Sequence, residues 1–131
     1  MINLQHVSFA YDKSLVLEDV TLRERNPVIT GIWGRNGSGK TTLMKILSGQ
    51  NKADSGTAEI LGQEPYNNSK AARNICYMQE NHPFPSIWTV QDAMRFGKYF
   101  NENWDQETAE QLKELFRLPD KKKIRKLDRK S

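Results

Sequence analysis

The sequence has little cysteine, no long apolar run and almost no net charge outside its C-terminal end. Cys76 is the single cysteine in 131 residues, which excludes an internal disulfide and fits a reducing compartment. No apolar run approaches the roughly 18 residues of a membrane span. The first residues, MINLQHVSFAYDKS, lack the basic and apolar regions of a secretory leader. We therefore expect a globular domain in which Cys76, within the apolar run ICYM, is buried.

The positive charge of the chain is local. The formal net charge is +4, but residues 119–131 hold seven of the 20 basic residues and two of the 16 acidic ones. The first 118 residues then carry 13 basic and 14 acidic side chains. A basic tail can bind nucleic acid or acidic lipid, although it is more often a solvated surface. No aromatic residue is interleaved with these charges to stack on bases, so we expect no nucleic-acid partner.

The pattern of apolar residues predicts an α/β fold. Alternating residues predict two strands, and nearly continuous apolar runs predict strands buried on both faces. Turn signals on both sides favour one further antiparallel strand. The predicted strands cover residues 2–11, 15–24, 27–34, 56–65 and 74–80.

Capping residues predict where the helices begin and end. A helix is expected over residues 41–49, with Gly49 just past its end. Thr89 and Asp92 have the spacing of a capping box, and Asp105 can cap a further helix that stops before Pro119. We expect Trp88 and Trp104 to pack these helices against their neighbours.

Residues 34–42, GRNGSGKTT, fit the pattern G-x-x-x-x-G-K-[ST] between a predicted strand and a predicted helix. Glycines there permit positive φ, so that backbone N–H groups and the helix N-terminus face an anion. Lys40 can reach the β- and γ-phosphates, Thr41 can ligate Mg²⁺, and Thr42 can donate a further hydrogen bond. The predicted phosphate-binding residues are Gly34, Arg35, Asn36, Gly37, Ser38, Gly39, Lys40, Thr41 and Thr42.

Taken in order, the segments VSFAY, VLEDVTL, GRNGSGKTTLMKILSG, DSGTAEILGQEP and ICYMQE resemble the ATP-binding cassette (ABC) ATPases. The helical part, from WTVQDAMRFGKYF onward, is similar to the bacterial transporter ATPases of that superfamily, so the resemblance covers essentially the whole chain. It implies a partial P-loop NTPase core with an antiparallel β-subdomain over residues 1–85. It also implies the start of a helical subdomain over residues 86–131.

The resemblance implies two further site residues. Tyr11 matches the aromatic residue that stacks on adenine, and its alternative role is that of an ordinary strand aromatic. Gln79 matches the glutamine that contacts Mg²⁺ and the attacking water, and its alternative role is that of a solvated residue at a strand end. The resemblance gives no role to His6 or to His82, which follows Gln79 in a proline-rich loop.

Other motifs of the family do not occur in these residues. A signature motif is expected where the chain has LDRKS, residues 127–131, and the Walker B aspartate, the catalytic glutamate and the switch histidine lie further on in the family. We therefore expect the front part of a cassette, from a shortened reading frame or a fragment. The family places later strands beside residues 27–34 and 74–80, so we expect these edges to be open and the isolated chain to be less stable.

By resemblance, the chain is the ATP-binding subunit, or part of it, of an ABC transporter. It is implied to bind ATP and Mg²⁺, a second ATPase subunit and a transmembrane permease at the cytoplasmic face of the membrane. Whether it hydrolyses ATP stays open. A non-catalytic remnant or regulatory fragment that pairs with a full cassette is the alternative. A P-loop kinase fits less well because no acceptor-substrate motif is present. A DNA-repair relative also fits less well because the inserts expected of it are missing.

Overall fold

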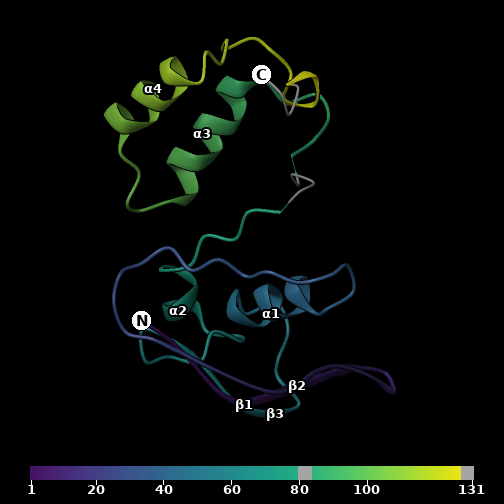
Figure 1. Ribbon diagram of the computed structural model, residues 1–131. Helices are drawn as coiled ribbons and strands as arrows, with labels where there is room; N and C mark the ends of the chain where they lie inside the picture. The colour runs from purple at the N-terminus through teal and green to yellow at the C-terminus, as the bar shows by residue number, and fades with distance from the viewer. Residues whose placement is uncertain (80–83, 128–131) are drawn as a thin grey trace. The chain divides into compact units, whose positions relative to one another are not determined.

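The computed structural model describes residues 1–79 and 84–127. The chain divides into two compact units, Met1–Met78 and Gln79–Ser131, which are described separately. Strands and the phosphate-loop helix belong to the first unit, and two longer helices belong to the second (Figure 1).

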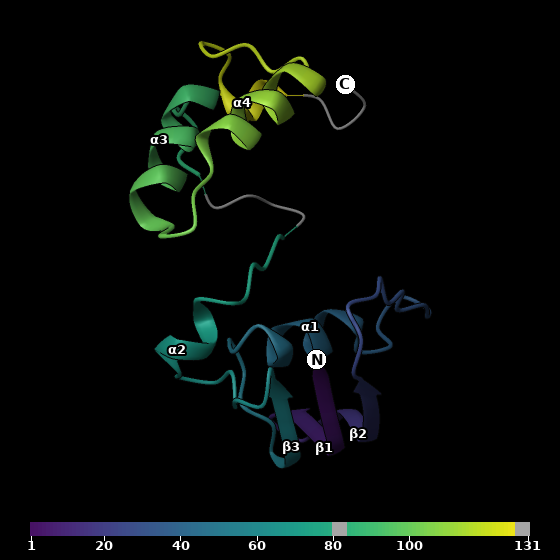
Figure 2. The same ribbon diagram turned by 90° about the vertical axis from the view of Figure 1, so that its left-hand side faces the viewer.

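A three-stranded antiparallel sheet organises the first unit. Strands β1 (Ile2–Tyr11), β2 (Ser14–Glu24) and β3 (Ser55–Ile60) lie in the order β2-β1-β3, as Figure 2 shows. The first two strands form a hairpin, and β3 pairs with the other edge of β1. These three strands confirm the alternating pattern at residues 2–11 and 15–24 and the antiparallel strand near residue 56.

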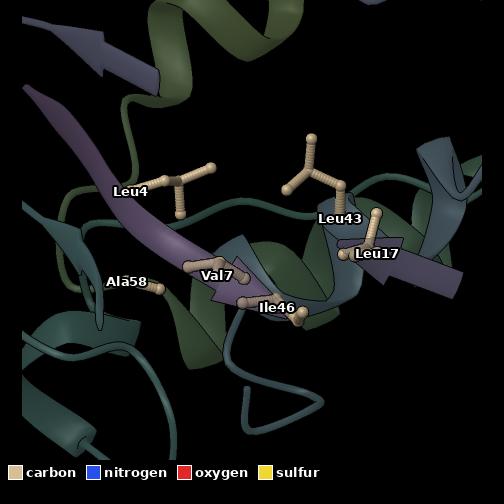
Figure 3. Close-up of a cluster of buried hydrophobic side chains, with 6 residues drawn as sticks. All are labelled: Leu4, Val7, Leu17, Leu43, Ile46 and Ala58. Atoms are coloured by element: carbon tan, nitrogen blue, oxygen red, sulfur yellow. The ribbon is translucent and has the colours of Figure 1, made fainter. Parts of the chain in front are cut away.

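Helix α1 (Lys40–Leu47) covers one face of this sheet. It ends where the sequence predicts, because Gly49 follows with a φ of 77° and its amide donates to the Ile46 carbonyl. The buried core beneath the helix consists of Leu4, Val7, Leu17, Leu43, Ile46 and Ala58 (Figure 3). Burial of each large aliphatic side chain contributes about 1.5–3 kcal/mol, so these residues fix α1 on the sheet.

Two predicted strands are wrong. Residues 27–34 and the described part of 74–80 adopt no strand, although both are apolar. Ile29 is 103% exposed and Trp33 is 101% exposed, and Cys76 is exposed where a buried position was expected. A strand exists only where a neighbour takes up its N–H and C=O groups, and the sheet of the described residues consists of β1, β2 and β3 alone.

One short helix had no signal in the sequence beyond a turn. Helix α2 (Ser69–Ala72) follows the turn at residues 65–68, and the Asn68 side chain accepts hydrogen bonds from the amides of Lys70 and Ala71. Asn68 thus acts as an N-cap in addition to its place in the turn.

Helices α3 (Val90–Phe100) and α4 (Gln106–Leu115) lie side by side in the second unit. A 3₁₀ turn follows at Ile124–Lys126. The predicted capping box is confirmed, since Thr89 Oγ1 accepts from the Asp92 amide and Asp92 accepts from the Thr89 amide. Asp105 caps α4 as predicted.

Both tryptophans of the second unit pack as the sequence predicts. A Cβ added at Gly97 of α3 would lie 2.4 Å from the Trp104 ring, so α3 and Trp104 touch closely. Trp88 lies 5.5 Å from the Phe84 ring and 5.3 Å from the Phe96 ring, centroid to centroid. Aromatic contacts therefore join α3 to the segments on either side of it.

Candidate functional site

The glycine-rich loop of residues 34–39 leads directly into α1. Gly37 and Gly39 have φ values of 85° and 84°, which confirms that two positions of the loop need left-handed backbone. The Ser38 amide donates to the Arg35 carbonyl at 3.2 Å and closes a turn between them. Left-handed residues placed between ordinary ones curve a chain so that successive N–H groups face one concave side.

Packing is close around two glycines of this loop, and at Gly39 it excludes a side chain. A Cβ at Gly34 would lie 2.6 Å from Ser38 Oγ. A Cβ at Gly39 would lie 2.7 Å from Leu17 Cδ2 and 2.9 Å from the Val16 carbonyl oxygen of β2. The start of α1 therefore rests on the sheet at van der Waals distance, and the loop projects from a fixed point.

The Lys40 ammonium lies inside the loop. Its Nζ donates to the carbonyl oxygens of Gly34 and Arg35, each at 2.7 Å, and lies 3.4 Å from Ser38 Oγ. Lys40 is the first residue of α1, so its charge adds to the positive end of the helix. The positive charge is thus concentrated where the loop turns.

The N-terminus of α1 differs from those of the other described α-helices. Asn68, Thr89 and Asp105 cap α2, α3 and α4 through their side chains, whereas the N-cap of α1 is Gly39 and makes no side-chain hydrogen bond. The first N–H groups of a helix have no partner within it. In α1 they are left to bind a group from outside, and an anion satisfies both their hydrogen bonds and the helix dipole.

The two threonines after Lys40 occupy different environments. Thr41 is exposed at the start of α1, where its hydroxyl is accessible to a hydrated cation. Thr42 is buried, with 7% of its surface exposed. The assignments of Thr41 to Mg²⁺ and of Thr42 to phosphate stay predictions.

Tyr11, the last residue of β1, carries a contact that the sequence did not indicate. Asn51 Nδ2 donates to the Tyr11 hydroxyl at 3.1 Å, across 40 positions of chain. The hydrogen bond from Asn51, followed by one involving Thr42, lowers the pKa of the Tyr11 phenol below its usual value. Tyr11 stays 45% exposed, so part of its ring is open to a ligand.

The remaining candidate residues are Gln79 and the two histidines. Gln79 is exposed and begins the second unit, so its role with Mg²⁺ stays a prediction. His6 Nδ1 lies 2.6 Å from Asp19 Oδ1 in an exposed pair across β1 and β2. His82 lies outside the described residues. Within residues 1–79 and 84–127, no group of three His, Cys, Asp or Glu side chains could hold a metal ion.

The site fits the triphosphate of a nucleotide on its own geometry. Packing excludes a larger residue at Gly39, the helix N-terminus carries no side-chain cap, and an ammonium lies within the turn. An oxygen-rich Mg²⁺ site fits the loop only in part, since Thr41 is the single hydroxyl ligand expected there. Mg²⁺ bound together with phosphate oxygens keeps several water ligands, so one protein ligand suffices.

Comparison with known families shows the family to which the chain belongs. A family model described as ABC transporter matches residues 17–130. The chain belongs to this family. The ABC transporter ATP-binding protein YtrB of Bacillus subtilis is 35% identical over 127 residues, which cover 97% of this chain and 44% of that protein. The petrobactin import ATP-binding protein YclP of the same species is 31% identical over 101 residues, covering 76% of this chain and 40% of YclP.

Solved ABC structures share the fold. The structure of an ATP-binding subunit of an ABC transporter superposes with a TM-score of 0.83 at 22% identity, covering 97% of this chain and 55% of that one. The chain thus spans about half the length of the ABC proteins that it matches. The α/β assignment and the ABC resemblance inferred from the sequence are confirmed.

Proposed function

We propose that the chain binds Mg-ATP through residues 34–42 and forms the ATP-binding part of an ABC transporter ATPase. The position of the Lys40 ammonium carries the proposal, because it lies within the glycine turn at the uncapped start of α1. Bound there, ATP supplies the free energy of hydrolysis for transport. The protein's own share is to bind and orient the phosphates through backbone N–H groups and Lys40.

Three further residues are proposed to contact the metal ion and the adenine. Thr41 and Gln79 would hold Mg²⁺ through a hydroxyl and an amide oxygen, and Tyr11 would stack on adenine. The ATP-binding role of relatives such as YtrB supports this proposal.

We propose the partners by analogy with transporter ATP-binding proteins such as YclP. YclP is named as an import ATP-binding protein, and we propose that this chain works with a second ATPase subunit and a transmembrane permease. Among the described residues, no helix has the length and apolar character to cross a membrane. We propose that such a complex places the chain at the cytoplasmic face of the membrane, through the permease.

Calorimetric titration of the purified chain with Mg-ATP tests the proposal. We expect Lys40→Ala to weaken binding at least about tenfold, because it removes a charged hydrogen-bond donor from the phosphates. Lys70→Ala is the matched control, since it removes an exposed lysine from another helix of the same unit. Equal affinity of the wild type and Lys40→Ala, or no binding by the wild type, would contradict the proposal.

A further inference from the structure

A hydrogen bond joins the end of β1 to the far end of the phosphate-loop helix. Asn51 Nδ2 donates to the Tyr11 hydroxyl at 3.1 Å. Asn51 is itself fixed to the helix end, because its backbone N–H donates to the Lys45 carbonyl at 3.2 Å. Tyr11 is therefore tied to α1, the same helix that begins in the phosphate loop.

The Tyr11 ring is held at two further points. Phe9, two residues earlier on β1, meets it edge to face with ring centroids 4.9 Å apart and planes at 85°. Thr42, in the first turn of α1, also contributes to the lowered pKa of the Tyr11 phenol, after Asn51. The ring is thus oriented from its hydroxyl and from one neighbour, while 45% of Tyr11 stays exposed.

An exposed aromatic ring that hydrogen bonds and packing hold in one orientation favours the stacking of a flat ligand on it. A side chain that is already ordered loses little rotamer freedom when a flat ligand binds, so more of the contact energy appears as affinity. An exposed tyrosine without such bonds would lose this freedom on binding.

We propose that Asn51 is a positioning residue for the nucleotide base, because it fixes the Tyr11 ring on which the adenine of ATP stacks. This inference rests on the proposed function. Asn51 follows the C-terminal end of α1 and donates to the Tyr11 hydroxyl, whereas the Lys40 ammonium lies in the glycine turn at the other end of the helix. Loss of the Asn51 side chain should therefore weaken binding of the adenine and leave binding of the phosphates unchanged.

Two ligands that differ by the nucleoside separate these contributions. The affinities of the wild type and Asn51→Ala for Mg-ATP and for magnesium inorganic triphosphate are measured by calorimetry on the full chain. We expect Asn51→Ala to bind ATP about two- to tenfold more weakly, the range for one aromatic stacking contact. Its affinity for inorganic triphosphate should equal that of the wild type.

Tyr11→Phe gives an independent readout, since it keeps the ring and removes only the hydroxyl. Because this hydroxyl also interacts with Thr42, Tyr11→Phe should lose at least as much ATP affinity as Asn51→Ala, and the double variant should lose no more than Tyr11→Phe. Asn51→Leu, which keeps the size of the side chain and removes the donor, carries the test if Asn51→Ala does not fold. Gln50→Ala is the matched control, because it removes an exposed carboxamide one position earlier.

Each contrary outcome has a distinct meaning. Unchanged ATP affinity in Asn51→Ala and Tyr11→Phe, or equal losses for both ligands, would refute the positioning role and leave phosphate binding intact. Additive losses in the double variant would also refute it. A wild type that binds neither ligand would refute the proposed function, and the positioning role with it.

Discussion

Two apolar parts of the first unit behave in opposite ways. The sheet and α1 bury their aliphatic side chains against one another, with Leu4 and Val7 at 0% exposure. Residues 28–33, which are as apolar, form no strand and leave Ile29 and Trp33 fully exposed. Hydrophobic composition alone therefore does not produce a buried strand, because a partner surface must be present as well.

The second unit is an intermediate case. Val90, at 5% exposure, is its one buried hydrophobic residue among those that the structure describes. Its helices depend on local interactions, namely the Thr89 capping box, the Asp105 cap and aromatic contacts around Trp88. We expect shared burial to dominate the stability of the first unit and local hydrogen bonds to matter more in the second.

The largest difference in stability is expected between alanine substitutions of two isoleucines. Ile46→Ala removes a side chain that is 1% exposed, and we expect a loss of about 2–5 kcal/mol in the free energy of unfolding. Ile29→Ala shortens a side chain that is 103% exposed, and should change that free energy by less than about 0.5 kcal/mol. Urea denaturation followed by circular dichroism measures both. A large loss for Ile29→Ala would show that residues 28–33 are packed in solution.

A smaller difference in stability is expected between alanine substitutions of two glycines. Gly56 has a φ of 79°, and a Cβ there would lie 2.3 Å from the His6 carbonyl oxygen. We expect Gly56→Ala to cost about 1–3 kcal/mol through backbone strain and this clash. Gly31 has no atom within 4 Å of an added Cβ, so Gly31→Ala should be neutral or stabilise by up to about 1 kcal/mol. Thermal melting of the two variants measures both stability losses. A loss for Gly31→Ala as large as that for Gly56→Ala would contradict this prediction.

The smallest effect concerns the cap of α3. Thr89→Ala removes hydrogen bonds to Asp92 and should cost about 1 kcal/mol at neutral pH. The pKa of the Asp92 carboxyl lies below its usual value of 3.8, first because the Thr89 backbone N–H donates to it and second because the Thr89 hydroxyl does. Thr89→Ala keeps the backbone bond and removes the bond from the hydroxyl. A lowered folded-state pKa means that the carboxylate's contribution is complete above the unfolded value and is lost as pH falls through the folded one.

The difference in the free energy of unfolding between the wild type and Thr89→Ala should therefore become smaller below about pH 4. Thermal melts between pH 7 and pH 2 measure it, with Thr108→Ala as a comparison at the cap of α4. A difference that stays constant over this range would show that the Asp92 carboxylate does not take part.

Local signals in the sequence predicted much of the structure. The capping box, the Asp105 cap, Gly49 and the glycine-rich loop were all found, because each depends on residues within nine consecutive positions of the chain. The ABC kinship was also clear from the order of the motifs. Helix α2 was missed because its single signal, Asn68, was taken only as part of a turn.

Contacts between distant residues could not be predicted in this way. The apolar runs at 27–34 and 74–80 have strand composition, but their strand state depends on neighbours that composition does not specify. The Asn51–Tyr11 hydrogen bond joins residues 40 positions apart, and nothing in the residues around Asn51 indicates it.

The sequence by itself determined the glycine-rich loop, since glycine spacing and the following helix depend only on local backbone preferences. It also determined the helix caps and the family. The tertiary structure alone decided which apolar segments are buried and how Tyr11 is tied to α1. The reason is physical: burial and long-range hydrogen bonds exist only between surfaces that folding brings together, and no single segment encodes both sides of such a contact.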